Sequence, residues 1–403
     1  MTEDEIYRAS SQYRLWSFTP EALASLRANT NSAAAARVRA AIRRGSKLNS
    51  TTNGASNGET NGAAKTNGKT DRDTECLTVE EEAKLVQYYC SACLQMADSF
   101  DFLVPINVKA TAVQYIKRFY LYNSPMTYHP KQIMPSALFL ATKTENHYIS
   151  VSKYVKGIRK ATPEDILAPE FIITQALRFT FDVRHPHRAL KGGIMELLSL
   201  AAGTSSLLPG LNKSPSQLAS ELRSLPAENG IPQNPTERIN RAYEAAKHLL
   251  SNAAILTDAY FLYTPSQIFL SSLYSADKLL TFFYLSTKFP SSTFSFQPSP
   301  SFTSTPPVLS KLLLVLEACT QLLHSHRSTK EERDECVRID KKLYQCRNPE
   351  KMDLVGLNRA QKRGGGVEGE VTESVGKKRR LEREVEAKRS EEVFGGELKR
   401  EGG

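Results

Sequence analysis

Two cysteines three positions apart are the first residues in this sequence whose spacing suggests chemistry. Cys90 and Cys93 have the separation found in half of a zinc site. A structural zinc ion needs four ligands, and no second pair of cysteines or histidines accompanies these two. We therefore interpret Cys90 and Cys93 as residues of a helix face or a core, and we predict no metal site.

Other candidates for chemistry also fail on context. His185 and His187 flank Pro186, and we interpret them as part of a turn with helix-capping residues. The glycine run 364–366 lies in a polar tail without a preceding strand, so it does not meet the requirements of a phosphate-binding loop. No Ser-His-Asp or Cys-His arrangement is recognisable from spacing. These observations predict no cofactor and favour a binding protein over an enzyme.

A repeated helix start indicates how the chain is built. The segment 128–133 (YHPKQI) returns at 263–268 (YTPSQI), and the same offset relates Ser136 to Ser271 and Leu138 to Leu273. Each start has proline at the first helical position, followed by small and apolar residues. A constant offset indicates two similar modules. Because no segment alternates apolar and polar residues over a sustained length, we predict an all-α fold without a sheet.

Composition limits where the protein works. Six cysteines show no paired framework, which favours a reducing compartment such as cytosol or nucleus. The net charge of +10 lies largely outside the apolar segments, so it favours acidic partners only weakly. We expect no signal peptide and no apolar run long enough to cross a bilayer, since the most apolar stretch, near Leu312–Leu316, is too short.

Composition shifts and helix-start signals divide the chain into six segments. We predict an N-terminal segment and helix at 1–44, a disordered Asn/Gly-rich insert at 45–77, a first five-helix module at 78–184, a second module at 185–307 with loops at about 203–234 and 286–307, C-terminal helices at 308–347, and a disordered charged tail at 348–403. The insert has almost no apolar side chains, so burial cannot offset the entropy lost on ordering.

Three strings then resemble the cyclin family, most closely its H-type transcriptional members. They are Ser11–Phe18 (SQYRLWSF), Lys117–Ser124 (KRFYLYNS) and Ala254–Ile268 (AILTDAYFLYTPSQI). The resemblance covers about residues 10–30 and 78–346 and implies two tandem cyclin-box domains. The long Pro/Ser-rich loops resemble those of a fungal-type member. We further expect the helix from Pro20 and the C-terminal helices to pack on the two modules and lock their orientation.

The resemblance also implies a kinase-binding site. Cyclins bind their kinase through a lysine on the third box helix and a glutamate on the fifth, which correspond here to Lys143 and Glu170. Taken alone, both residues are explained by favourable interactions with helix dipoles. Further candidates at this site are Phe139, Thr144, Glu145, Ile173 and Leu177. The three apolar members of that set are equally explained as core residues.

The function implied by the resemblance is that of a non-catalytic regulatory subunit. It would bind and activate a cyclin-dependent kinase of the CDK-activating kinase and TFIIH type, with a RING-containing assembly factor as third subunit and an indirect link to the TFIIH core. The substrates would be the RNA polymerase II C-terminal domain and the activation loops of other kinases. A basic cluster is a candidate nuclear-localisation signal, consisting of Lys377, Lys378, Arg379 and Arg380.

Alternatives remain open at this point. The same fold would suit a cyclin for another transcriptional kinase, or a DNA-binding factor similar to TFIIB. Direct DNA binding would need a basic stripe across the folded helices, and the sequence does not indicate one. We expect no membrane association.

Overall fold

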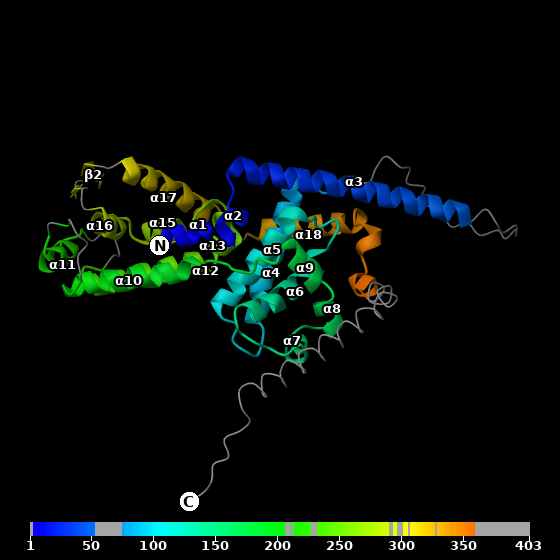
Figure 1. Cartoon of the computed structure of the whole chain (residues 1–403), viewed down its shortest axis with the longest axis horizontal. Coiled ribbons are helices and arrows are strands. Elements are labelled where there is room, and N and C mark those ends of the chain that lie inside the picture. Colours follow the sequence, from blue (N-terminus) through cyan, green and yellow to red (C-terminus); the bar gives the residue numbers. More distant parts are fainter. Residues whose placement is uncertain are drawn as a thin grey trace, which may run out of the picture. The chain divides into compact units, whose positions relative to one another are not determined.

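The structure is a computed structural model that describes residues 3–52, 75–205, 211, 213–226, 232–289, 293–295, 301–304, 307–326 and 329–358. It divides the chain into two units, residues 1–352 and 353–403. All helices and strands named below belong to the first unit, and Figure 1 labels many of them. Within the second unit, residues 354–358 are helical.

The first module consists of helices packed around α5 and α6. Its elements are α4 (Val79–Asp98), α5 (Ile106–Tyr122), α6 (Pro130–Thr144), α7 (Val151–Lys156), α8 (Pro163–Leu167) and α9 (Glu170–Ala176). Helix α5 packs against α4, α6 and α9, and its side chains from Ala110 to Leu121 are all buried. A buried helix normally needs apolar residues on every face, and here the buried polar residues Thr111, Gln114, Lys117 and Arg118 are hydrogen-bonded instead. The short helix α8 was not predicted.

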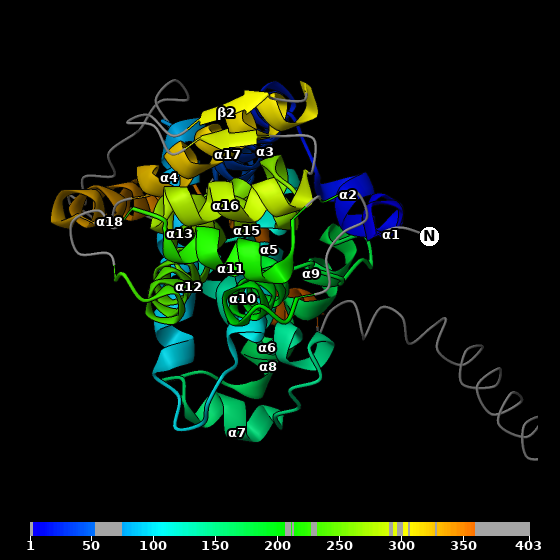
Figure 2. The same cartoon turned by 90° about the vertical axis from the view of Figure 1, so that its left-hand side faces the viewer.

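The second module repeats this arrangement, with α15 as the equivalent of α6. It comprises α10 (Pro186–Ala202), α11 (Pro215–Arg223), α12 (Pro235–Ser251), α13 (Ala253–Leu256), α14 (Ala259–Leu262), α15 (Pro265–Ala276), α16 (Lys278–Lys288) and α17 (Pro307–Ser325). Helix α15 packs against α10, α12, α16 and α17. Figure 2 shows α16 beside α17. Leu285 of α16 forms an apolar cluster with Leu309 and Leu316 of α17.

The repeated helix starts of the sequence are α6 and α15, the central pair of equivalent helices. Both carry proline in the first turn. His129 caps α6 by accepting a hydrogen bond from the Lys131 N–H at 3.1 Å. Thr264 caps α15 in a reciprocal pair with Gln267. The prediction of two similar helical modules is confirmed, because equivalent sequence signals start equivalent helices.

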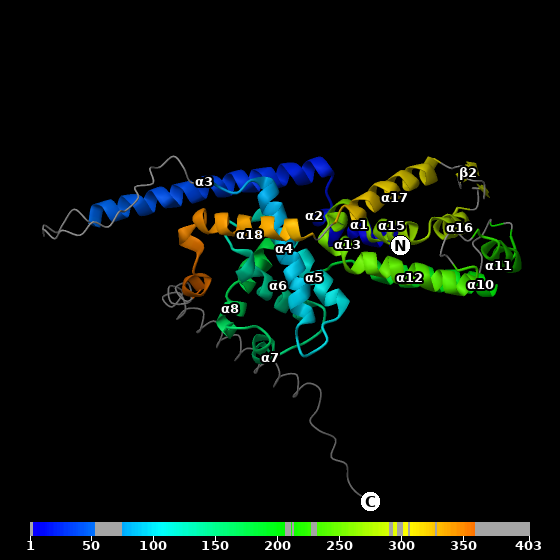
Figure 3. The same cartoon turned by 180° about the vertical axis from the view of Figure 1, so that it is seen from behind.

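Terminal helices join the modules. They are α1 (Glu3–Ala9), α2 (Ser11–Trp16), α3 (Pro20–Thr52), α18 (Lys330–Gln345) and the 3₁₀ helix η1 (Pro349–Lys351). Trp16 of α2 and Leu23 of α3 form one apolar cluster with Leu121 of the first module and Phe261 of the second. Helix α18 packs on α4, as Figure 3 shows. The predicted packing of the Pro20 helix on both modules is confirmed.

The prediction of no sheet was wrong in one place. Strands β1 (Thr293–Ser295) and β2 (Ser301–Ser304) form an antiparallel pair inside the predicted loop 286–307, with Phe294 opposite Phe302. Such a hairpin needs only local pairing of residues with β-propensity, so it is too short to produce a sustained alternation in the sequence.

Several predicted boundaries were also wrong. Helix α3 runs to Thr52, which lies inside the predicted insert 45–77. Leu77, at the C-terminal end of that insert, is buried. Helix α16 extends to Lys288, into the predicted loop 286–307. Asn348 lies in the predicted tail 348–403, but its backbone N–H donates to the Met126 carbonyl at 2.8 Å. Extending an existing helix needs no new nucleus, so polar residues can follow an apolar helix. The rest of the insert and of the tail lies outside the described residues.

Helix α17 contradicts one further expectation. Within the described residues, Val308–Ser325 is long and apolar enough to cross a bilayer by length and composition alone. The apolar stretch near Leu312–Leu316 is therefore part of a longer apolar segment than we predicted. Leu316, Cys319 and Leu323 form the face of α17 that is buried against the second module, whereas Val308 and Leu314 are exposed.

Candidate functional site

Lys143 and Glu170 form an ion pair at the surface of the first module. Lys143 lies in the last turn of α6, and Glu170 opens α9 directly after Pro169. Their Nζ and Oε1 atoms are 2.6 Å apart, and the side chains are 39% and 24% exposed. The Lys143 ammonium lies 4.6 Å from the centroid of the Phe139 ring. Ion pairs this accessible to water stabilise a fold little, so these charges can change partners at small cost.

The three apolar candidates close to this pair in the sequence are buried. Ile173 and Leu177 have no exposed surface, and Phe139 is buried against Tyr154, with 5.0 Å between ring centroids. Ile173 and Leu177 are thus core residues that fix α9, and we expect them to support a site rather than to touch a partner.

Thr144 and Glu145 are also tied inward. The Tyr115 hydroxyl donates to the Thr144 hydroxyl at 2.9 Å, and the Thr111 hydroxyl donates to the Glu145 carboxylate at 2.7 Å. Both bonds anchor the end of α6 to α5. The position of Lys143 is therefore set by the hydrogen bonds of the residues that follow it.

Three exposed apolar side chains in the segments around α6 and α9 were not predicted as site residues. Phe171 of α9, Leu167 at the end of α8 and Tyr148 after α6 are all exposed. The helical phase of α9 contained this signal for Phe171, because Ile173 and Leu177 occupy the inner face and Phe171 lies off it. Phe171 directly follows Glu170 in the sequence, so one exposed apolar residue adjoins the accessible charge.

The cysteine pair is a core feature. Cys90 and Cys93 are fully buried in α4, and burial raises the pKa of Cys90 to about 12 and that of Cys93 further still. Thiols that resist ionisation are poor metal ligands. In the described ranges no three His, Cys, Asp or Glu side chains are placed to hold a metal ion. The core interpretation is confirmed.

The side chain of His185 connects the two modules. Its Nε2 atom lies 2.8 Å from the Thr111 hydroxyl, and its Nδ1 atom lies 3.1 Å from the Tyr260 hydroxyl. His185 is the N-cap residue of α10, as expected for a turn with capping residues, but its side chain makes no capping bond to that helix. Burial, together with His187 and Arg118, lowers the pKa of His185 to about 3, and the neutral ring bridges α5 and α14.

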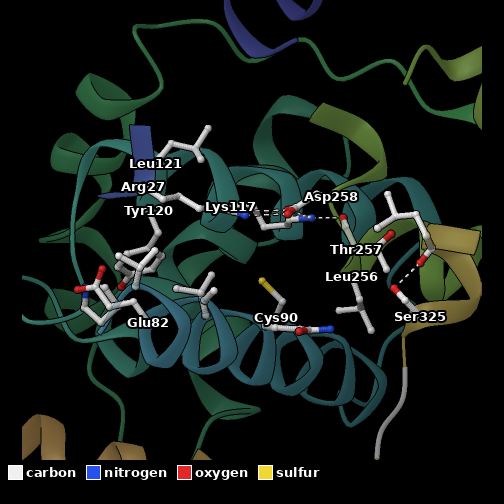
Figure 4. Close-up of a pocket in the computed structure, with 16 residues that line it drawn as sticks. Arg27, Glu82, Cys90, Lys117, Tyr120, Leu121, Leu256, Thr257, Asp258 and Ser325 are labelled. Carbon is white, nitrogen blue, oxygen red and sulfur yellow. Dashed lines mark hydrogen bonds and ion pairs between the residues drawn. The ribbon is translucent and has the colours of Figure 1, made fainter. Parts of the chain in front are cut away.

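A second cluster of charges lies where the modules meet (Figure 4). Asp258 follows α13, and its carboxylate accepts two hydrogen bonds from Arg27 of α3, at 2.7 and 2.8 Å. Lys117 of α5 approaches the same carboxylate at 3.6 Å. These side chains border a cavity of about 200 Å³. Lys117 and Asp258 lie within two of the cyclin-like strings, but neither was predicted as a site residue. The four basic residues Lys377–Arg380 lie outside the described residues.

Comparison with known proteins identifies both modules. Residues 91–182 match the cyclin N-terminal domain, and residues 185–324 match the cyclin C-terminal domain, which includes α17. Cyclin CCL1 of Saccharomyces cerevisiae is 29% identical over 291 residues, which are 72% of this chain and 63% of the yeast protein. Cyclin mcs2 of Schizosaccharomyces pombe is 29% identical over 273 residues, 68% of this chain and 69% of that protein.

Solved structures extend the likeness. The CAK complex of Chaetomium thermophilum bound to ATP-gamma-S contains a chain that is 32% identical, with a TM-score of 0.66, covering 91% of this chain and 96% of that one. The yeast TFIIK (Kin28/Ccl1/Tfb3) complex contains a chain that is 26% identical, with a TM-score of 0.51, covering 79% and 100%. With both domains matched in order and the fold shared over nearly its full length, this chain belongs to the cyclin family.

Proposed function

We propose that this chain is the non-catalytic cyclin subunit of a cyclin-dependent kinase of the CDK-activating kinase and TFIIH type. The observation that carries the proposal is the likeness to a chain of the CAK complex over 91% of this sequence. The likeness to the yeast TFIIK complex, named for Kin28, Ccl1 and Tfb3, supports the same partner class. The activated kinase would phosphorylate the RNA polymerase II C-terminal domain and the activation loops of other kinases.

The surface around Lys143 and Glu170 is the proposed kinase contact. Its paired charges and exposed Phe171 offer both polar and apolar groups to one partner helix. A kinase needs its regulatory helix positioned so that the glutamate of that helix pairs with the ATP-orienting lysine. The cyclin biases the kinase toward this state only to the extent that it binds that state more tightly.

The proposal includes the setting of the complex. The three components named for the yeast complex support a ternary assembly, and we infer that the third subunit here is a RING-containing assembly factor that connects the pair to the TFIIH core. A nuclear location follows from this role. Regulation of a kinase, without catalysis by this chain, agrees with its family.

A reconstitution assay tests the proposal. The full chain, as wild type and as Lys143→Ala/Glu170→Ala, is mixed with a TFIIH-type kinase and a polymerase C-terminal-repeat peptide. The matched control is Lys247→Ala/Glu244→Ala, which removes another exposed ion pair of 3.2 Å, on α12. We expect activation by wild type and control, and a loss of at least about tenfold in the double variant, which corresponds to about 1.4 kcal/mol of binding.

Each other outcome has a defined meaning. Equal activation by the double variant would keep the kinase partner and remove Lys143 and Glu170 from the contact. No activation by the folded wild-type chain, even with the assembly factor present, would contradict the partner. Activation of a different transcriptional kinase, or DNA binding that weakens steeply with salt, would then identify the alternative function.

A further inference from the structure

Three distant parts of the chain meet at one carboxylate. Asp258 belongs to the second module, Lys117 to the first, and Arg27 to the N-terminal helix α3. Arg27 binds both carboxylate oxygens of Asp258, and Lys117 also donates to the Thr257 carbonyl. Figure 4 shows the Arg27 and Lys117 side chains converging on Asp258. A bidentate contact of arginine with a carboxylate fixes direction as well as distance.

These charges are withdrawn from water unequally. Lys117 is 6% exposed, whereas Arg27 and Asp258 keep about a quarter of their surfaces. Burial lowers the pKa of Lys117, and the adjacent Asp258 opposes that change. Burial likewise raises the pKa of Asp258, but Lys117 and Arg27 hold it at about 2. The carboxylate is thus the shared counterion of one cation from the first module and one from α3.

The N-terminal segment makes apolar contacts to both modules next to this group. The Phe18 N–H donates to the Phe261 carbonyl at 2.8 Å, and the two rings meet edge to face. Trp16 and Leu23 pack against Leu121 and the same Phe261. The segment 16–27 therefore spans the junction, and Arg27 is its ionic contact there.

Packing alone does not fill this junction. A cavity of about 200 Å³ lies beside the ion group, bordered by α4, α5, the end of α17 and residues 256–258. This cavity is partly open to solvent, so side chains do not interlock across that part of the junction. Directional bonds such as those of Arg27 therefore contribute to holding the modules together there.

We propose that Arg27 is a positioning residue, which holds Asp258 against Lys117 and thereby fixes the angle between the two modules. Without Arg27, the modules sample a range of angles around the cavity while each keeps its own fold. Where this rests on the proposed function, a chain with a broad range of angles also activates the kinase less, although Lys143 and Glu170 are intact.

Distances between the modules in the free full-length chain test this proposal. Spin labels are placed through Glu164→Cys on α8 and Arg241→Cys on α12, both exposed, with Cys76→Ser removing the cysteine that is only partly buried. We compare wild type with Arg27→Ala. The matched control is Arg44→Ala. Arg44 lies on the same helix as Arg27, and the change removes its exposed ion pair with Glu350, which is 2.8 Å long.

We expect one narrow distance distribution for wild type and Arg44→Ala, and a distribution at least twice as broad for Arg27→Ala. Arg27→Lys keeps the charge but loses the bidentate geometry, so it should give an intermediate width. It also keeps the test decisive if Arg27→Ala fails to fold. An unchanged distribution in the folded Arg27→Ala or Arg27→Lys chain would overturn the proposal.

Kinase activation gives a second, separate readout. A several-fold loss of activation by Arg27→Ala, with Arg44→Ala unchanged, is expected. Broadened distances with unchanged activation would keep Arg27 as the residue that fixes the angle and would overturn its effect on the kinase. If the wild-type chain activates no such kinase, the proposed function fails, and the distance measurement still decides the role of Arg27.

Discussion

The two central helices α6 and α15 start alike and end differently. Helix α6 ends in the accessible ion pair of Lys143 with Glu170. Helix α15 is followed by Asp277, which pairs with Arg238 of α12 at 2.6 Å, with both side chains at most 4% exposed. One module therefore keeps its charges where a partner can reach them, and the other uses them inside its core.

The chain that follows each helix explains this difference. After α15, Asp277 alone separates it from α16, and the Asp277 carboxylate caps α16 by accepting the Leu280 N–H at 2.9 Å. After α6, a longer turn leads to α7 at Val151. A carboxylate held between two closely joined helices is buried, whereas the end of α6 remains open to solvent.

Removing the buried carboxylate should have the largest effect on stability. Asp277→Ala leaves the Arg238 guanidinium buried with only the carbonyls of Leu225 and Pro226, and we expect it to lower the free energy of unfolding by about 3–5 kcal/mol. Urea denaturation followed by circular dichroism measures this loss. A decrease below about 1 kcal/mol would mean that the two carbonyls suffice for Arg238, and that the modules differ less than the geometry indicates.

A buried carboxylate in the first module sharpens the comparison. Glu82 of α4 is bonded by Ser124, and burial raises the pKa of its carboxyl to about 7, against the opposing hydrogen bonds of Ser124 and Asn31. The pKa of Glu82 is higher in the folded chain than in the unfolded chain. The contribution of protonated Glu82 to stability is therefore fully present below about pH 4.5 and is lost as the pH rises through 7. Ionising Glu82 at pH 8 then costs about 3 kcal/mol.

Glu82→Gln should remove that cost. We expect the variant to be more stable than wild type by about 1–3 kcal/mol at pH 8 and nearly equal to it at pH 5. Denaturation at both pH values measures the difference, with Glu80→Gln, an exposed neighbour on the same helix, as control. If Glu82→Gln and wild type show the same pH dependence, Glu82 does not bind its proton more tightly in the folded chain.

The exposed pair should have the smallest effect on stability. Lys143→Ala removes an ion pair that water already screens, so we expect a change of less than about 1 kcal/mol in the free energy of unfolding. Thermal and urea unfolding beside Asp277→Ala measure the contrast directly. A loss comparable to that of Asp277→Ala would show that the first module also relies on its surface charges for folding.

The sequence was most informative where signals are local. Proline with a capping residue located the starts of α6 and α15 to the residue. It was less informative where a boundary depends on neighbours, as at the end of α3 and in α16. Among the site candidates, the sequence selected Lys143 and Glu170, which the fold brings together, but it could not separate them from Ile173 and Leu177, which the fold buries.

The sequence by itself determined the helical class, the two modules and the family, because caps, apolar periodicity and an internal repeat act over a few residues or recur along the chain. Only the tertiary structure decided which charges are free to bind and which hold the fold. Arg27 meets Asp258 across 231 positions, and Arg238 meets Asp277 across 39. The strength of an ion pair depends on its burial and on the geometry of its partners, and both exist only once the chain is folded.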